Sequence, residues 1–326
     1  MKRAIVLAGA LLLSCLAYRP PVHAQSLAPV PRIGVLRFTE LKGGDQFMEA
    51  FRLGLRELGY IEGKNLAIEW RSADANSDRA GELAADLVRL KVSIIVASGT
   101  LAAEAAQHAT RKIPIVLASV ADARGSGFVR NLARPGGNIT GVSLNYPETT
   151  GKQLELLRQA IPGLSRVAFL GSAADSASRL FVEATERAGQ RLGIQTQVFL
   201  VGGSDEFEGA FAAMRREQAG ALIVQPVFLD SIRRIVELAN RNHLPTVSFR
   251  RSFAEAGLLF SYGADQRESW RRAAIYVDKI LKGAKPGNLS VAEPSKYELV
   301  VNLKTAKTLG LTIPQAVVGR ADSVIQ

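Results

Sequence analysis

Residues 94–100, Ile-Ile-Val-Ala-Ser-Gly-Thr, contain the features that decide the fold class of this chain. The apolar start of this stretch predicts a short buried strand. Thr100 can cap a helix, and the alanine-rich residues 102–106 follow it. A strand that is apolar throughout and leads directly into a helix is typical of a parallel sheet covered on both faces.

The same strand–helix unit recurs on both sides of this stretch. Apolar or alternating runs predict strands at residues 33–36, 66–70, 94–96, 114–117, 139–144, 167–170, 195–201, 221–224, 246–249, 258–260 and 297–301. Because right-handed crossovers join such units into doubly wound sheets, we expect an α/β protein with two Rossmann-like, parallel-sheet lobes joined by a hinge. One large sheet is the alternative, but open sheets of that size are uncommon.

The N-terminal residues 1–24 have the pattern of a secretory signal peptide. Lys2 and Arg3 precede an apolar run over residues 4–16, and Val-His-Ala at residues 22–24 offers a cleavage site. The run is too short for a transmembrane anchor, which needs roughly 20 apolar residues. We therefore expect export to the periplasm. Lipidation at Cys15, the single cysteine of the chain, is the minor alternative.

The chain is basic, with a formal net charge of +11. A basic surface can indicate nucleic-acid binding. Here the Lys and Arg residues are spread along the chain, and many fall on the predicted solvent faces of helices beside Glu or Asp. We therefore expect a solvated basic surface and no nucleic-acid partner.

Motifs of catalysis and of cofactor binding are missing from the sequence. We find no G-x-S-x-G elbow and no phosphate-binding loop, and the glycine pair at Gly125 and Gly127 lacks the third glycine of a dinucleotide fingerprint at Arg130. With the cysteine confined to the expected signal, thiol catalysis and cysteine metal sites are excluded from the mature chain. We expect a protein that is not an enzyme and that needs no metal and no cofactor.

In parallel α/β sheets, ligands bind at the carboxyl ends of the strands, and two facing lobes place these ends across a cleft. The loops after the predicted strands of the first lobe offer Thr39, Glu40, Ser98, Gly99, Thr100, Ser119 and Asp122 as candidate ligand-binding residues. Those of the second lobe offer Asn145, Tyr146, Gly171, Ser172, Gln225, Pro226, Phe228, Arg250 and Tyr262.

Some of these candidates have a specific expected role. Residues 98–100 combine two hydroxyls with a helix N-terminus, which suits a carboxylate, although Thr100 can equally serve only as a cap. Asp122 can accept an ammonium group or cap the segment that follows it. Tyr146, Phe228 and Tyr262 can stack on a flat ligand. Arg250 can face the cleft or lie in a solvated loop.

Four sequence segments carry a family resemblance. Leu-Gly-Tyr at 58–60 with Glu-Gly-Lys-Asn-Leu at 62–66, the segment Leu-Ala-Arg-Pro-Gly-Gly-Asn-Ile-Thr-Gly at 132–141, and the runs at 276–286 and 298–307 resemble one family of ABC transporter substrate-binding proteins. The resemblance implies a type I periplasmic-binding-protein fold, whose lobes close over a ligand. Some relatives bind tryptophan, phenylalanine or tyrosine.

The resemblance also implies roles for particular residues. In such sites the α-carboxylate meets a Ser/Thr-rich strand end, here residues 98–100, and the ammonium meets a carboxylate, for which Asp122 is the candidate. Relatives often carry Asp-Pro-Val at that strand end, whereas this chain has Asp-Ala-Arg at residues 122–124. We expect lobe 1 to comprise residues 30–144 and 266–290, and lobe 2 residues 145–265 and 291–326.

The sequence therefore predicts a monomeric, extracytoplasmic solute-binding component of an ABC importer, which takes a small-molecule ligand, such as an aromatic or other amino acid, to an inner-membrane permease. A periplasmic sensory binding protein that presents its ligand to a membrane receptor is the main alternative. A DNA-binding repressor of this fold is disfavoured because only the expected signal peptide precedes residue 32. An enzyme would have to show turnover that one polar substitution abolishes.

Overall fold

The computed structural model describes residues 30–40 and 45–326. The expected signal peptide and Cys15 lie outside the described residues. Within the described part of the chain, none of the helices has both the length and the apolar character needed to span a bilayer. The described residues form two β-sheets, each covered by helices.

The first sheet is parallel throughout. In the described residues it has the strand order β2-β1-β3-β4-β5. Its strands are β1 (Arg32–Arg37), β2 (Ala67–Ser72), β3 (Ile94–Ser98), β4 (Ile115–Val120) and β5 (Ile139–Ser143). Residues of β3, β4 and β5 are almost all buried, as their apolar composition predicts. This sheet confirms the parallel α/β architecture expected for the first half of the chain.

The second sheet has the order β12-β11-β10-β9-β8-β6-β7 in the described residues. Its strands are β6 (Arg166–Ser172), β7 (Gln195–Val201), β8 (Ala221–Val224), β9 (Thr246–Ser248), β10 (Phe260–Ala264), β11 (Tyr297–Asn302) and β12 (Ser323–Ile325). This sheet is parallel except at one pair of neighbours, because β11 runs antiparallel to β10. The chain leaves β10 for a helix on the first sheet and returns, so β11 starts where β10 ends.

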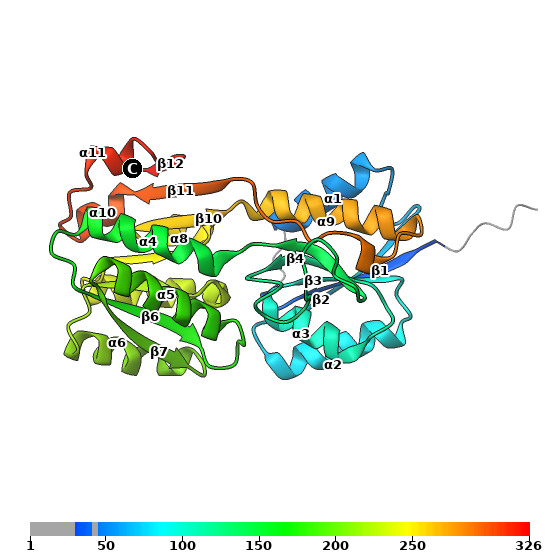
Figure 1. The fold of residues 1–326 in the computed structure, drawn as a ribbon, viewed down its shortest axis with the longest axis horizontal. Helices are drawn as coiled ribbons and strands as arrows, with labels where there is room; N and C mark the ends of the chain where they lie inside the picture. The colour runs from blue at the N-terminus through cyan, green and yellow to red at the C-terminus, as the bar shows by residue number, and fades with distance from the viewer. Residues whose placement is uncertain (1–29, 41–44) are drawn as a thin grey trace, which may run out of the picture. The chain divides into compact units, whose positions relative to one another are not determined.

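Helices cover both faces of the first sheet (Figure 1). One face carries α1 (Gln46–Glu57) and α9 (Gln266–Leu281), which pack closely on each other. The other carries α2 (Ser77–Arg89) and α3 (Thr100–Ala109). At Gly54 a side chain would approach the Arg271 carbonyl oxygen to 2.8 Å, so glycine permits the close α1–α9 contact.

Helices also lie on both faces of the second sheet. A core that includes Phe169, Phe181 and Phe249 lies under α4 (Tyr146–Ala160), α5 (Ser178–Leu192) and α11 (Gln315–Val318). A second core lies under α6 (Phe207–Arg216), α7 (Ile232–Arg241) and α8 (Arg251–Ala256). The short helix α10 (Leu303–Thr308) follows β11, and the 3₁₀ segments are η1 (Ser204–Glu206), η2 (Pro226–Ser231) and η3 (Pro286–Asn288).

Side chains cap the N-termini of α1 and α2 but not that of α3. Asp45 caps α1 by accepting the amide of Phe47 at 2.8 Å, and Asn76 caps α2. The cap expected of Thr100 is absent, since Gly99 is the N-cap residue of α3 and no side chain bonds to that helix end. The Thr100 hydroxyl is therefore not used as a helix cap.

The chain crosses from one sheet to the other at three places. The first passage joins β5 to α4, the second joins β10 to α9, and the third leads from Ala292, which bridges to Val142 of β5, to β11. Each passage is short. The carboxyl ends of β1, β3 and β4 and those of β6, β8 and β9 contribute residues to one common pocket.

Candidate functional site

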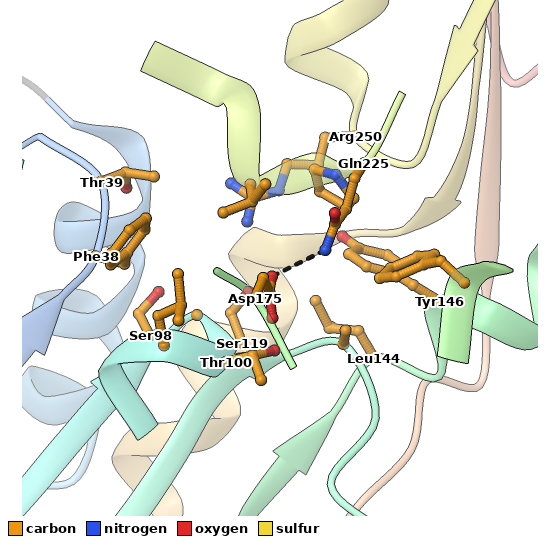
Figure 2. Close-up of a pocket in the computed structure, with 16 residues that line it drawn as sticks. Phe38, Thr39, Ser98, Thr100, Ser119, Leu144, Tyr146, Asp175, Gln225 and Arg250 are labelled. Atoms are coloured by element: carbon orange, nitrogen blue, oxygen red, sulfur yellow. Dashed lines mark hydrogen bonds between the residues drawn. The ribbon is translucent and has the colours of Figure 1, made fainter. Parts of the chain in front are cut away.

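A pocket lies at the carboxyl ends of strands from both sheets (Figure 2). Nine of the residues expected from the sequence line it, namely Thr39, Ser98, Gly99, Thr100, Ser119, Tyr146, Gln225, Pro226 and Arg250. Sequence reasoning missed seven further lining residues, namely Phe38, Leu101, Ala121, Leu144, Asp175, Phe181 and Val227.

The first sheet contributes uncharged polar groups to the pocket. Ser98 ends β3, Gly99 turns with φ of 94°, and Thr100 begins α3. The first amides of a helix have no intrahelical acceptor, and the helix dipole adds partial positive charge there. Because the Thr100 hydroxyl is not a cap, this corner of the pocket offers donors suited to a carboxylate.

Ser119 lies beside this corner, near the end of β4. Its hydroxyl oxygen accepts a hydrogen bond of 2.9 Å from Nε2 of Gln266, the first residue of α9. Both side chains are buried. This bond fixes the Ser119 hydroxyl, so its proton can be donated toward the pocket.

Asp122 does not line the pocket. Its Oδ1 accepts the amides of Arg124 at 2.9 Å and Gly125 at 2.8 Å, so the carboxylate closes the turn after β4. The expectation that Asp122 receives an ammonium group is therefore corrected, and the capping alternative describes what the side chain does.

Asp175 supplies the carboxylate of the pocket instead. It is 7% exposed, in the loop between β6 and α5, and its Oδ1 accepts the amide of Ala177 at 2.9 Å. Burial raises the pKa of Asp175 to about 6, and the nearby negative charge of Glu104 acts in the same direction. A buried carboxylate with a raised pKa is poised to gain from a cationic partner.

Gln225 orients this carboxylate. Its Oε1 accepts the amide of Ser172 at 2.8 Å and the hydroxyl of Ser178 at 2.8 Å, so its Nε2 must face the other way. Nε2 donates to Oδ2 of Asp175 at 2.9 Å, the bond drawn in Figure 2. Ser172, which was expected to touch the ligand, therefore acts through Gln225.

Arg250 and Tyr146 complete the second sheet's side of the pocket. Arg250 is half-buried, and its Nε has no hydrogen-bond partner. Burial lowers the pKa of Arg250 below its usual range. Tyr146 is 1% exposed, and its buried hydroxyl faces Arg250 and Gln266. Burial raises the pKa of Tyr146 to about 12, so the phenol is neutral.

Two expected aromatic residues stack on other protein rings. Phe228 packs edge-on against Phe207 with ring centroids 5.2 Å apart, and Tyr262 stacks on Tyr297 at 5.9 Å. Neither lines the pocket. Sequence alone could not separate them from Tyr146, because all three occur near strand ends.

Three further candidates lie near the pocket without lining it. The amide of Glu40 donates to Oδ2 of Asp230 at 3.0 Å, a bond between segments 190 residues apart. Asn145 has the left-handed φ of 51° at the start of α4, and Gly171 lies against Phe169. These three residues shape the surroundings of the pocket.

Metal binding has no support in the geometry. Among residues 30–40 and 45–326, no group of three or more His, Cys, Asp or Glu side chains could hold a metal ion.

Known proteins are similar to this chain in sequence and in fold. A tyrosine-binding protein from Clostridioides difficile (strain R20291) is 25% identical over 284 residues, which cover 86% of this chain and 81% of that protein. A conserved domain protein from Vibrio cholerae has a crystal structure 28% identical to this chain, with a TM-score of 0.85, covering 90% of this chain and 99% of that one.

A second solved structure, the ABC domain in complex with L-Trp from Streptococcus pneumoniae, is 26% identical, with a TM-score of 0.85 and the same coverage of 90% and 99%. The architecture is that of type I periplasmic binding proteins. The model of the family described as ABC transporter substrate binding protein matches residues 32–325. The chain therefore belongs to the ABC transporter substrate binding protein family, which is a family of binding proteins and not of enzymes.

Proposed function

We propose that this protein is the extracytoplasmic solute-binding component of an ABC importer and that it captures an α-amino acid. The observation that carries the proposal is the pairing of a buried carboxylate, Asp175, with the N-terminus of α3 across one pocket. An amino acid carries an ammonium and a carboxylate on one carbon. Asp175 receives the first, and residues 98–100 receive the second.

The comparisons support this ligand class. One relative is named for tyrosine, and one similar structure holds L-Trp. Aromatic amino acids are therefore among the first ligands to screen. Phe38, Leu101 and Leu144 give the pocket an apolar part that can hold aliphatic or aromatic atoms of a side chain.

Ligand capture works by closure of two lobes, which we assign to residues 30–144 with 266–290 and residues 145–265 with 291–326. The ligand contacts groups from both lobes, so it stabilises the closed form relative to the open one. One chain supplies both sides of the pocket, so a monomer is sufficient for capture under this proposal. The closed form docks on a permease in the inner membrane, and the signal peptide of residues 1–24 directs export to the periplasm.

A sensory role is the alternative, in which the closed form is presented to a membrane receptor. Belonging to an ABC transporter substrate binding family favours transport. Loss of uptake of the bound amino acid in a deletion strain, restored by the wild-type chain, supports transport. Unchanged uptake with a lost transcriptional response contradicts it.

A thermal-shift screen with the common amino acids tests the proposal. A ligand present at 100 times its Kd should add about 2.7 kcal/mol of stability. Asp175→Asn should abolish the shift, whereas the matched control Asp122→Asn should retain it, because Asp122 binds only turn amides. Absence of any shift with a folded wild-type protein contradicts amino-acid capture.

A further inference from the structure

We propose that Arg250 selects amino acids whose side chain carries a second anionic group, so that the ligand of this pocket is an acidic amino acid. The inference rests on the proposed function and specifies the ligand class of the same pocket. It starts from Nε of Arg250, a buried donor without an acceptor of its own, and from the Tyr146 hydroxyl that lies beside the Arg250 guanidinium. Both residues line the pocket.

Arg250 is a cation without an ion-pair partner in the described part of the chain. The groups that face it are Tyr146, the carboxylate of Asp230 and the guanidinium of Arg37. Arg37 repels it and is itself ion-paired with Asp45. Asp230 is exposed, where solvent screens its attraction, and its Oδ2 already accepts the amide of Glu40. The positive charge at the pocket wall is therefore left for a ligand to neutralise.

Three anchoring groups of the pocket differ in charge. In Figure 2, Arg250 lies in the upper part of the view, Ser98 and Thr100 lie in the lower part, and Asp175 lies at a height between them. The pocket thus combines a donor corner, a carboxylate and a guanidinium. Glutamate and aspartate carry two carboxylates and one ammonium, which gives one complementary group for each.

A ligand with an apolar side chain would leave the charge of Arg250 without an anionic partner when the cleft closes. A buried donor without an acceptor is costly, and sites built around such donors discriminate strongly against ligands that lack the acceptor. A side-chain carboxylate satisfies Nε of Arg250 with a charge-assisted bond and can also accept the proton of the Tyr146 hydroxyl. We therefore expect a side-chain acid to bind at least tenfold tighter than its amide.

Titration calorimetry of the full chain with matched ligands tests this selection. The pairs are L-glutamate with L-glutamine and L-aspartate with L-asparagine, and L-tyrosine, L-phenylalanine and L-tryptophan complete the set. The tightest ligand should be an acidic amino acid, with its amide at least tenfold weaker. Tightest binding by an aromatic or amide ligand overturns the inference while leaving amino-acid capture intact. Binding of none of them overturns both.

Two neighbouring arginines provide the variant and its control. Arg250→Gln should remove the preference for the acid over the amide. Arg251→Gln should keep it, because Arg251 is ion-paired with Glu255 and Glu298 and does not line the pocket. A preference that survives in Arg250→Gln overturns the inference.

A second variant covers the case in which Arg250→Gln does not fold. Arg250→Lys keeps the charge but removes Nε, so it should weaken glutamate more than glutamine. Equal weakening of the two ligands overturns the inference.

Discussion

The two proposed lobes supply the pocket with different chemistry. The first contributes a helix terminus and the hydroxyls of Ser98, Thr100 and Ser119, whereas the second contributes the charged side chains of Asp175 and Arg250. Hydroxyls and amides at the start of a helix can bind any carboxylate. Under the proposal, both lobes bind what all amino acids share, the first the α-carboxylate and the second the ammonium through Asp175. Only Arg250, in the second lobe, distinguishes one side chain from another.

Breaking the Gln225 network should produce the largest effect. Gln225→Ala leaves Oδ2 of Asp175 and the Ser172 amide without their shared partner, whereas the Ser178 hydroxyl keeps its bond to the Ser172 carbonyl oxygen. We expect a loss of about 2–4 kcal/mol in the free energy of unfolding and more than tenfold in amino-acid affinity. Urea unfolding and calorimetry measure the two effects.

The matched control for this variant is Gln190→Ala, which removes an exposed glutamine of α5. It should change the free energy of unfolding by less than about 0.5 kcal/mol. A stable Gln225→Ala protein that binds with wild-type affinity would show that Asp175 needs no orientation.

Acid should weaken binding through the second lobe. With a pKa of about 6, Asp175 is mostly ionised at pH 7.5 and about nine-tenths protonated at pH 5. A protonated carboxyl cannot pair with an ammonium group, so affinity should fall about tenfold between these pH values. Calorimetry at both values measures it, and a pH-independent affinity in the wild type contradicts the role of Asp175. In Asp175→Asn the residual affinity should not vary over this range.

The same carboxyl should make the ligand-free protein more stable in acid over a defined window. Its folded pKa is raised above the usual 3.8, so the folded state binds the proton more tightly than the unfolded state. This contribution to stability is present below pH 3.8 and is lost as pH rises through about 6. The unfolding free energy of the wild type minus that of Asp175→Asn should therefore fall as pH rises across this window.

Substitutions in the first lobe should have the smallest and least selective effect. Thr100→Val removes one hydroxyl and leaves the α3 amides in place. We expect every amino-acid ligand to weaken by a similar factor, about three- to tenfold. A loss confined to one ligand class would contradict the division between the lobes, and calorimetry with an acidic and an apolar amino acid measures it.

The fold could be predicted from local sequence patterns, whereas the candidate site depends on contacts between residues far apart in the sequence. Apolar runs such as residues 94–96 can be buried only in a covered parallel sheet, so the architecture was accessible from sequence. Asp175 resembles a surface-loop residue, and its burial depends on Gln225, fifty positions later. The reversed direction of β11 depends on where the chain returns after α9. No periodicity encodes such long-range relations. The one local hint for Asp175 was a carboxylate just before a helix.

A crystal structure of the protein with its tightest amino-acid ligand tests the account most directly. The account predicts the ligand ammonium within hydrogen-bonding distance of Asp175 and the α-carboxylate at the amides that begin α3. An α-carboxylate bound by Arg250, or a ligand outside this pocket, would contradict it.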